Sequence, residues 1–207
     1  RQTHRGRGAD LEVDLSDETH AIGAVLLVAR VVRRGLLLVR ETRLERRRDL
    51  APRTLARALR GLGDNAPLFV SSSATGYYPP DARGRTFDES GPQGDAFLSD
   101  LCGEWEASAV ASGAPTALLR TAPVVHRDGV LKPLLLLTKA GLSGPLGRGT
   151  QVWPWISLDD EIRAIRHVID HGITGPVNLT GPERATANDL GFALARRLNR
   201  QYLLRAP

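Results

Sequence analysis

The stretch "FVSSSATGY", residues 69–77, decides the fold of this chain. The apolar residues Leu68, Phe69 and Val70 lead directly into three serines, a threonine and a tyrosine. Apolar runs of this length form buried strands, and open α/β sheets carry their functional groups at the carboxyl ends of the strands. We therefore expect a strand here that ends in a polar site.

The segments that flank this strand alternate between helical and extended patterns. Apolar periodicity and capping residues predict helices over residues 50–62, 96–112, 157–172 and from 186 onward. Extended patterns predict strands over residues 68–71, 116–120 and 175–181, with loops over 79–95 and 122–129. Because strands that alternate with helices form parallel sheets, we expect a doubly wound α/β fold. The first 47 residues do not follow this rhythm and receive no assignment.

Composition excludes several classes of protein. A chain of 207 residues with 42% hydrophobic content has the composition of a globular domain. The single cysteine, Cys102, excludes a disulfide framework and multi-cysteine zinc sites, and it indicates a cytoplasmic setting. The apolar run 21–39 is interrupted by Arg30, Arg33 and Arg34, which argues against a membrane span.

The positive charge is confined to the N-terminal segment. Residues 1–60 contain 14 arginines and 8 acidic residues, a surplus of 6, so the remaining residues of a chain with net charge +5 carry about −1. A basic segment is a possible nucleic-acid contact. However, "RLERRRDLAPR" (43–53) contains no interleaved aromatic residue and no recognisable motif, which argues against that function.

Five stretches in residues 49–200 resemble the epimerase family of atypical short-chain dehydrogenase/reductase proteins, relatives of the NAD-dependent sugar epimerases and dehydratases. They are "SSSATGYY" (71–78), "FDESGPQGDAFLSDLCGEWEASA" (87–109), "LLRTAPVVHRDG" (118–129), "GLSGPLGRGTQVWPWISLDD" (141–160) and "GPVNLTGPERATANDL" (175–190). The resemblance divides the chain into an unmatched Arg-rich segment, 1–48, and a Rossmann-like domain, 49–207, with small substrate-side elements in its C-terminal part.

The resemblance implies a domain that holds NADP or NAD across the carboxyl edge of its sheet. It places Ser73 where the sugar epimerases hydrogen-bond the reacting oxygen of the substrate, although a loop serine can also satisfy backbone groups. Of the adjacent tyrosines we expect one in the core and one at the site, and Tyr77 is our second catalytic candidate. The implied contacts on the nicotinamide side are Val70, Ser71, Ser72, Ala122 and Val124, and no metal is implied.

Two elements of the related enzymes are missing. Their Tyr-x-x-x-Lys pair transfers protons because the lysine lowers the pKa of the phenol, whereas the alignment through Glu106 puts Leu98 and Cys102 at these positions. Their GxxGxxG loop holds the cofactor's pyrophosphate, whereas "RGRGAD" (5–10) offers only GxG. We therefore expect no Tyr/Lys chemistry, weak or absent dinucleotide binding, and a fold incomplete at its N-terminal side. The unmatched N-terminus further suggests a fragment with a frame-shifted or spliced start.

Other residues with reactive side chains have simpler structural interpretations. Glu106 is expected to lie on a helix surface or to pair helices, and Trp105 and Cys102 to lie in the core. The acidic pair Asp159 and Asp160 is expected to cap a helix. His167 and His171 have the spacing of metal ligands but no third partner, so a helix C-terminus accounts for them better. His126 falls near the expected nicotinamide position.

The leading hypothesis is an NAD(P)-binding oxidoreductase or epimerase-like protein that lacks the Tyr-x-x-x-Lys pair. Its ligands would be a dinucleotide and a small molecule. The alternative is a non-catalytic nucleotide-binding module with a regulatory or interaction role. The sequence leaves open the substrate, the choice between NADP and NAD, and the oligomeric state.

Overall fold

A computed structural model of the chain describes residues 50–80, 84–145 and 147–204. The Arg-rich segment 1–48, with its apolar run and its GxG fragment, lies outside the described residues. From residue 50 onward the expected α/β fold with a parallel sheet is confirmed. None of the described helices combines the length and the apolar character that a membrane span requires.

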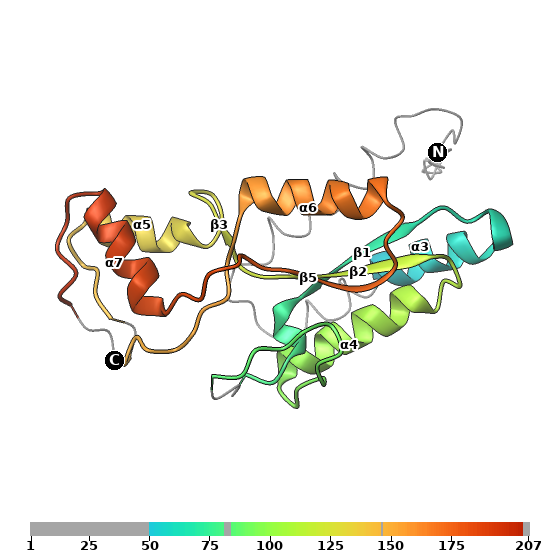
Figure 1. Ribbon diagram of the computed structural model, residues 1–207, viewed down its shortest axis with the longest axis horizontal. Helices are drawn as coiled ribbons and strands as arrows, with labels where there is room; N and C mark the ends of the chain where they lie inside the picture. Colours follow the sequence, from blue (N-terminus) through green and yellow to red (C-terminus); the bar gives the residue numbers. More distant parts are fainter. Residues whose placement is uncertain (1–49, 81–83, 146, 205–207) are drawn as a thin grey trace, which may run out of the picture.

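The main sheet contains three parallel strands in the described residues, in the order β1-β2-β5. These strands are β1 (Phe69–Ala74), β2 (Thr116–Thr121) and β5 (Gly175–Leu179). Helices cover both faces, with α6 (Leu158–Asp170) on one side and α3 (Leu50–Arg60) and α4 (Phe97–Val110) on the other (Figure 1). The sheet is therefore the middle layer of a three-layer sandwich.

Alternation along the strands divides the core between these faces. On the α6 face, Leu119 and Leu179 pack with Ile165 and Val168 of the helix. On the opposite face the buried cluster consists of Leu59, Phe69, Ala109 and Leu118. Because successive strand residues point to opposite faces, a difference of one position decides which helix a side chain meets.

The ends of α6 follow the predicted signals. The Ser157 hydroxyl accepts a hydrogen bond from the Asp160 backbone N–H at 3.0 Å and so caps the first turn. After the last turn, Gly172 adopts a left-handed conformation with φ of 61°, and the Ile173 N–H donates to the Val168 carbonyl at 3.0 Å. This is the glycine-terminated helix end that the sequence predicts.

The structure also corrects and extends the predicted elements. Strand β1 continues through the serines to Ala74, three residues beyond its predicted end. Residues 122–129, predicted as a loop, contain the short strand β3 (Val124–Val125), which pairs in parallel with β4 (Ile156–Ser157). The other elements are α5 (Leu131–Lys139), α7 (Ala187–Arg197) and the 3₁₀ turns η1 (Gly63–Asn65) and η2 (Thr75–Tyr77). A two-residue strand leaves no periodicity in the sequence, so only its partner defines it.

Candidate functional site

One row of residues crosses the main sheet near its carboxyl edge. Ser73, Arg120 and Asn178 are paired in register across β1, β2 and β5, so their side chains point to the same face, which α4 covers. There the Ser73 hydroxyl donates to Glu106 Oε1 at 2.7 Å. Arg120 donates from Nε to Oε1 and from Nη2 to Oε2 of Glu106, both at 2.9 Å. The middle residue of the row, Arg120, thus forms a buried, bidentate ion pair with Glu106 of the helix.

Tyr78 connects this ion pair to the third strand. Arg120 Nη1 donates to the Tyr78 hydroxyl at 3.0 Å, and that hydroxyl donates to Asn178 Oδ1 at 2.6 Å. The ring of Tyr77 lies under the Arg120 guanidinium, 3.6 Å from its central carbon, in a cation–π contact. We call Ser73, Tyr78, Glu106, Arg120 and Asn178 together the carboxyl-edge network.

The network also fastens a loop to the edge of the sheet. Arg120 Nη1 donates to the Glu89 carbonyl at 3.1 Å, and the Asn178 backbone N–H donates to Glu89 Oε1 at 2.9 Å. The ring of Phe87 stacks on Tyr78 with centroids 5.4 Å apart. The segment around these residues is therefore held against the end of β5 by both polar and aromatic contacts.

Electrostatics keep the network ionic and the nearby thiol neutral. Burial by itself lowers the pKa of Arg120, but the hydrogen bonds with Glu106 and Tyr78 outweigh burial and raise it above its usual range. Burial raises the pKa of Cys102 to about 11, and its side chain is almost fully inaccessible. Cys102 is therefore a protonated core residue, as predicted, and cannot replace the missing lysine.

The hydroxyl groups of the network already donate their protons to acceptors within it. A hydroxyl group has one proton to donate; that of Ser73 goes to Glu106, and that of Tyr78 goes to Asn178. By contrast, the hydroxyl groups of Ser72 and Thr75 have no hydrogen-bond partner among the described residues. Both line a cleft of about 1280 Å³ at the carboxyl ends of the three strands. They are the free polar groups at this end of β1.

Part of the predicted site lies in this cleft. Its walls come from the end of β1, the start of α4, the residues after β2 and β5, the start of α5 and the segment 152–155. Among the predicted residues, Ser72, Ser73, Ala122 and Val124 line it, as does Tyr78. The structure places Val70, Ser71 and Tyr77 outside its lining. Whether any of these residues contacts a cofactor stays a prediction.

Glu106 and Trp105 differ from expectation. The Glu106 side chain is buried between α4 and β2 instead of lying on the helix surface. The reason is Arg120, whose charge within the sheet requires an anionic partner. Trp105 is half-buried and lines the cleft instead of lying fully in the core.

The other acidic and histidine residues considered in the sequence lie outside this site. Asp160 takes part in the α6 cap, as predicted. His171 Nδ1 lies 2.9 Å from the His167 carbonyl at the end of α6, and no cluster of possible metal ligands occurs in the described ranges. His126 is partly exposed, and its Nδ1 accepts a hydrogen bond from the Asp128 backbone N–H at 3.2 Å.

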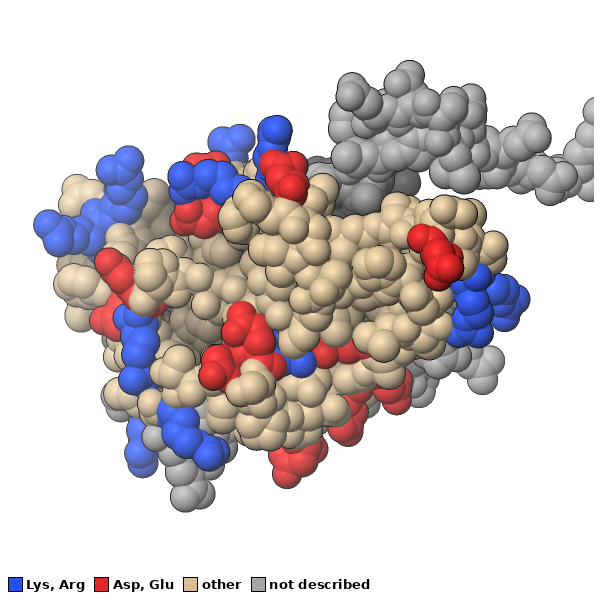
Figure 2. Space-filling model, turned by 45° about the vertical axis from the view of Figure 1, so that its right-hand side comes forward, with Lys and Arg blue, Asp and Glu red and all other residues tan. Residues whose placement is uncertain are grey.

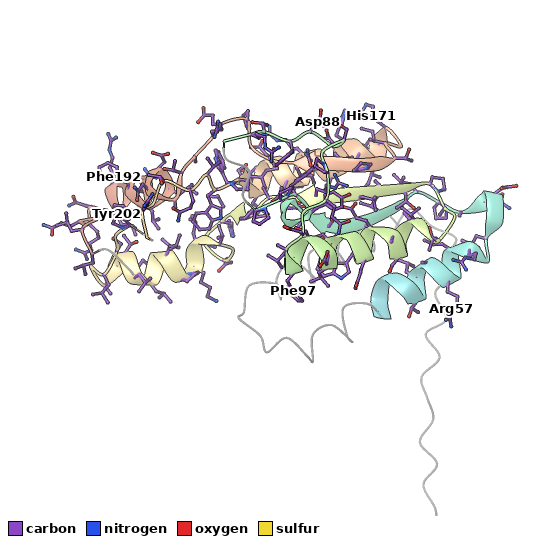
Figure 3. All side chains as sticks on the ribbon, turned by 90° about the horizontal axis from the view of Figure 1, so that it is seen from below. Arg57, Asp88, Phe97, His171, Phe192 and Tyr202 are labelled. Carbon is purple, nitrogen blue, oxygen red and sulfur yellow. The ribbon has the colours of Figure 1, made fainter. Side chains whose placement is uncertain are left out.

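Two further surface features bear on function. On the face shown in Figure 2, basic and acidic side chains form small mixed groups separated by broad uncharged areas, with no continuous basic stripe among the described residues. A second cavity, of about 770 Å³, is lined by Phe192 and Tyr202, which lie at the opposite end of the molecule from Arg57 of α3 (Figure 3). The cleft at the carboxyl edge remains the site with free hydroxyl groups.

No family model matches the chain, but individual proteins do. It is 38% identical over 144 residues to an epimerase family protein of Mycobacterium leprae, covering 67% of this chain and 47% of that protein. It is 34% identical over 152 residues to a human epimerase family protein, covering 69% of this chain and 52% of that protein. The chain therefore spans about half the length of the curated relatives it matches.

Solved structures agree with these relatives. The crystal structure of a human epimerase family protein with NADPH aligns with a TM-score of 0.75 and 26% identity, covering 85% of this chain and 62% of that one. A dTDP-glucose 4,6-dehydratase of Bacillus anthracis in complex with NAD aligns with a TM-score of 0.68 over 89% of this chain and 65% of that one. At 15% identity, the second match supports the Rossmann-like fold alone.

Proposed function

Because this chain belongs to the epimerase family over the part that its relatives match, we propose that it is an NAD(P)-dependent oxidoreductase or epimerase-like protein that works without a Tyr-x-x-x-Lys pair. The observation that carries this proposal is the cleft at the carboxyl ends of the three strands, into which the free hydroxyl groups of Ser72 and Thr75 open. A neighbour of the same fold was crystallised with NADPH.

The lining of the cleft fits the nicotinamide side of such a cofactor. Ser72, Ala122 and Val124 combine one free hydroxyl with apolar surface, which is the lining expected of a pocket for a partly apolar ring. A bound cofactor would supply hydride transfer, and the Thr75 hydroxyl would orient a substrate oxygen. Ser73 and Tyr77 enter this proposal as positioning residues, because both contact a partner within or beneath the ion pair.

The chain as it stands is expected to bind a dinucleotide only weakly. No glycine loop for the pyrophosphate occurs in the described residues, and each charge-assisted hydrogen bond to such a group contributes about 1.5 to 3 kcal/mol. Loss of two such bonds weakens binding by about a hundred-fold or more. Isothermal titration with NADPH and NADH, at low and at physiological salt, measures this directly. Tight, salt-insensitive binding would reveal a phosphate site among residues 1–48.

A version extended with the N-terminal half of a close relative tests the chemistry. We expect it to bind NADPH and to oxidise it in the presence of a carbonyl substrate, and Thr75→Val to reduce turnover at least tenfold by removing one hydroxyl while keeping the shape. Ser112→Ala is a control, because Ser112 is buried beyond the far end of α4. Equal loss in the two variants would contradict a role for Thr75.

One observation favours the alternative, a nucleotide-binding module without turnover. The hydroxyl protons of Ser73 and Tyr78 are both held by internal acceptors, so the network stabilises the fold without offering a proton. In that case the extended version binds NADPH, and the cofactor's absorbance stays constant with every carbonyl compound tested. We also propose a cytoplasmic location, which is compatible with both functions, because the single cysteine of the chain is free and buried.

A further inference from the structure

The cleft has an unusual concentration of aromatic and aliphatic side chains. The chain contains three tryptophans, and all of them, Trp105, Trp153 and Trp155, line it. They come from α4 and from the segment before β4. Leu134 of α5 and Leu98 of α4 add aliphatic surface to the walls. The cleft therefore combines these apolar walls with the free hydroxyl groups of Ser72 and Thr75.

Several apolar side chains of the cleft lining are exposed to solvent. Leu98 is 58% exposed, Phe97 is 53% exposed and Val152 is 48% exposed, although all three line the cavity. Figure 3 shows Phe97 at the start of α4. Leu98 stands against η2, the turn that follows β1, since a Cβ built on Gly76 would lie 3.4 Å from Leu98 Cβ. The exposed side chain of Leu98 therefore lies beside Gly76, the residue that follows Thr75.

Some of the polar groups in these walls are already engaged. Trp155 Nε1 donates to the Glu183 carbonyl at 3.1 Å, so the indole offers its ring and not its N–H. The charged residues of the described lining, Arg85, Glu183 and Arg184, are all exposed. The Arg85 guanidinium lies 5.3 Å from the centre of the Phe87 ring, and Arg184 donates to the Gly84 carbonyl. Within the described lining, charge is thus confined to two short exposed segments, at Arg85 and at residues 183–184.

We propose that the cleft takes an uncharged ligand with an aromatic or branched aliphatic body and one carbonyl or hydroxyl oxygen, and not a nucleotide sugar. This inference rests on the proposed function only for the statement that the ligand is a substrate. A sugar would bury several hydroxyl groups against indole rings and leucines, and each polar group buried without a partner is costly. An apolar body instead covers the exposed surface of Leu98 and the tryptophans. Its single oxygen meets Thr75.

Binding of two probes to the full chain, without cofactor, tests this inference. We choose 4-phenyl-2-butanone as the apolar ketone and UDP-glucose as the nucleotide sugar, and tryptophan fluorescence as the readout because all three indoles line the cleft. The ketone is expected to change the fluorescence saturably and to bind at least tenfold more tightly than UDP-glucose. Absence of saturable ketone binding, or tighter binding of UDP-glucose, overturns the inference.

A matched pair of variants locates the binding. Leu98→Asn places an amide in the apolar wall and is expected to weaken ketone binding about tenfold. Leu142→Asn is the control, since Leu142 is 56% exposed, close to the 58% of Leu98, but lies outside the cleft lining. Far-UV circular dichroism checks that both variants fold. Equal effects of the two variants overturn the inference, whereas failure of NADPH to bind the extended version overturns only the proposed function.

Discussion

Each face of the main sheet buries one glutamate from its covering helix, and the two glutamates differ in their partners. Glu106 of α4 is 8% exposed and receives two hydrogen bonds from the Arg120 guanidinium. Glu161 of α6 is 5% exposed, accepts one hydrogen bond from the Thr121 hydroxyl at 3.0 Å, and has no partner for Oε2 in the described part of the chain. Burial raises the pKa of Glu161 to about 7.

The comparison shows that the partner, and not the depth, sets the charge of a buried carboxyl group. Arg120 and Thr121 are neighbours in β2 and point to opposite faces. One supplies a full positive charge to Glu106, and the other supplies only a hydroxyl to Glu161. The α4 face therefore holds an ion pair, while the α6 face holds a carboxyl group that gains its proton near neutral pH.

Breaking the ion pair is the largest effect we expect. Arg120→Met leaves Glu106 buried without a counter-charge and removes the donor to Tyr78, so the free energy of unfolding should fall by about 3 to 5 kcal/mol. Urea denaturation at pH 7 measures this loss. The double variant Glu106→Gln/Arg120→Met removes both charges and should lose less than Arg120→Met alone. A double variant as unstable as the single one would mean that the unpaired charge is not the cause.

Neutralising the carboxyl group of Glu161, on the other face, should increase the free energy of unfolding instead of lowering it. The pKa of Glu161 is raised from 4.5 to about 7 in the folded protein, so the unfolded chain loses this proton first as pH rises. Stability is therefore lost between these two pH values. Glu161→Gln should raise the free energy of unfolding by about 1 to 2 kcal/mol at pH 8.

Denaturation of wild type and Glu161→Gln across pH gives the check on this prediction. The difference between them should shrink toward zero below pH 4, where the carboxyl group is largely protonated in both states. A difference that stays constant from pH 4 to pH 8 would show that packing, and not ionisation, separates the two proteins. Asp170→Asn is a suitable control, because Asp170 lies at the exposed end of the same helix.

The smallest effect we expect is the difference in stability between variants of the two adjacent tyrosines, Tyr77 and Tyr78. Tyr78→Phe removes a hydroxyl that accepts from Arg120 and donates to Asn178, and should cost about 1 kcal/mol of stability. Tyr77→Phe keeps the ring under the guanidinium and should change stability by only a few tenths of a kcal/mol. Thermal denaturation of both variants tests this. A larger loss from Tyr77→Phe would mean that its hydroxyl has a structural role.

Local signals in the sequence were sufficient for much of the fold. The alternation of apolar strands and capped helices predicted the parallel sheet, and the signals at Ser157 and Gly172 located both ends of α6. Helix α5 was not predicted: the run "LKPLLLLTK" has a proline at its third position, and Val130, at its N-cap, is not a capping residue. A proline is tolerated in the first turn of a helix, where its missing N–H has no intrahelical acceptor.

The site was predicted only in part, because its central contacts join distant residues. The serines and the residues after β2 could be placed at the carboxyl edge from their position after apolar runs. The pairing of Glu106 with Arg120 depends on the register between a helix and a strand, which local patterns do not encode. A signal was nevertheless present: Arg120 ends the run "TALLR" in a strand expected to be buried, and a buried charge requires a partner.

The row formed by Ser73, Arg120 and Asn178 also limits which changes of chain length the protein tolerates. Loss of one residue from β2, such as Leu119, would turn Arg120 toward α6 and present Thr121 to Glu106. No rotation of a side chain can reverse this exchange, because every later residue of the strand changes face. A compensating insertion of one residue in the same strand would restore both the face and the register of the row. Single-codon deletions in β2 should therefore be far more damaging than deletions of the same size in the exposed turn at residues 127–128.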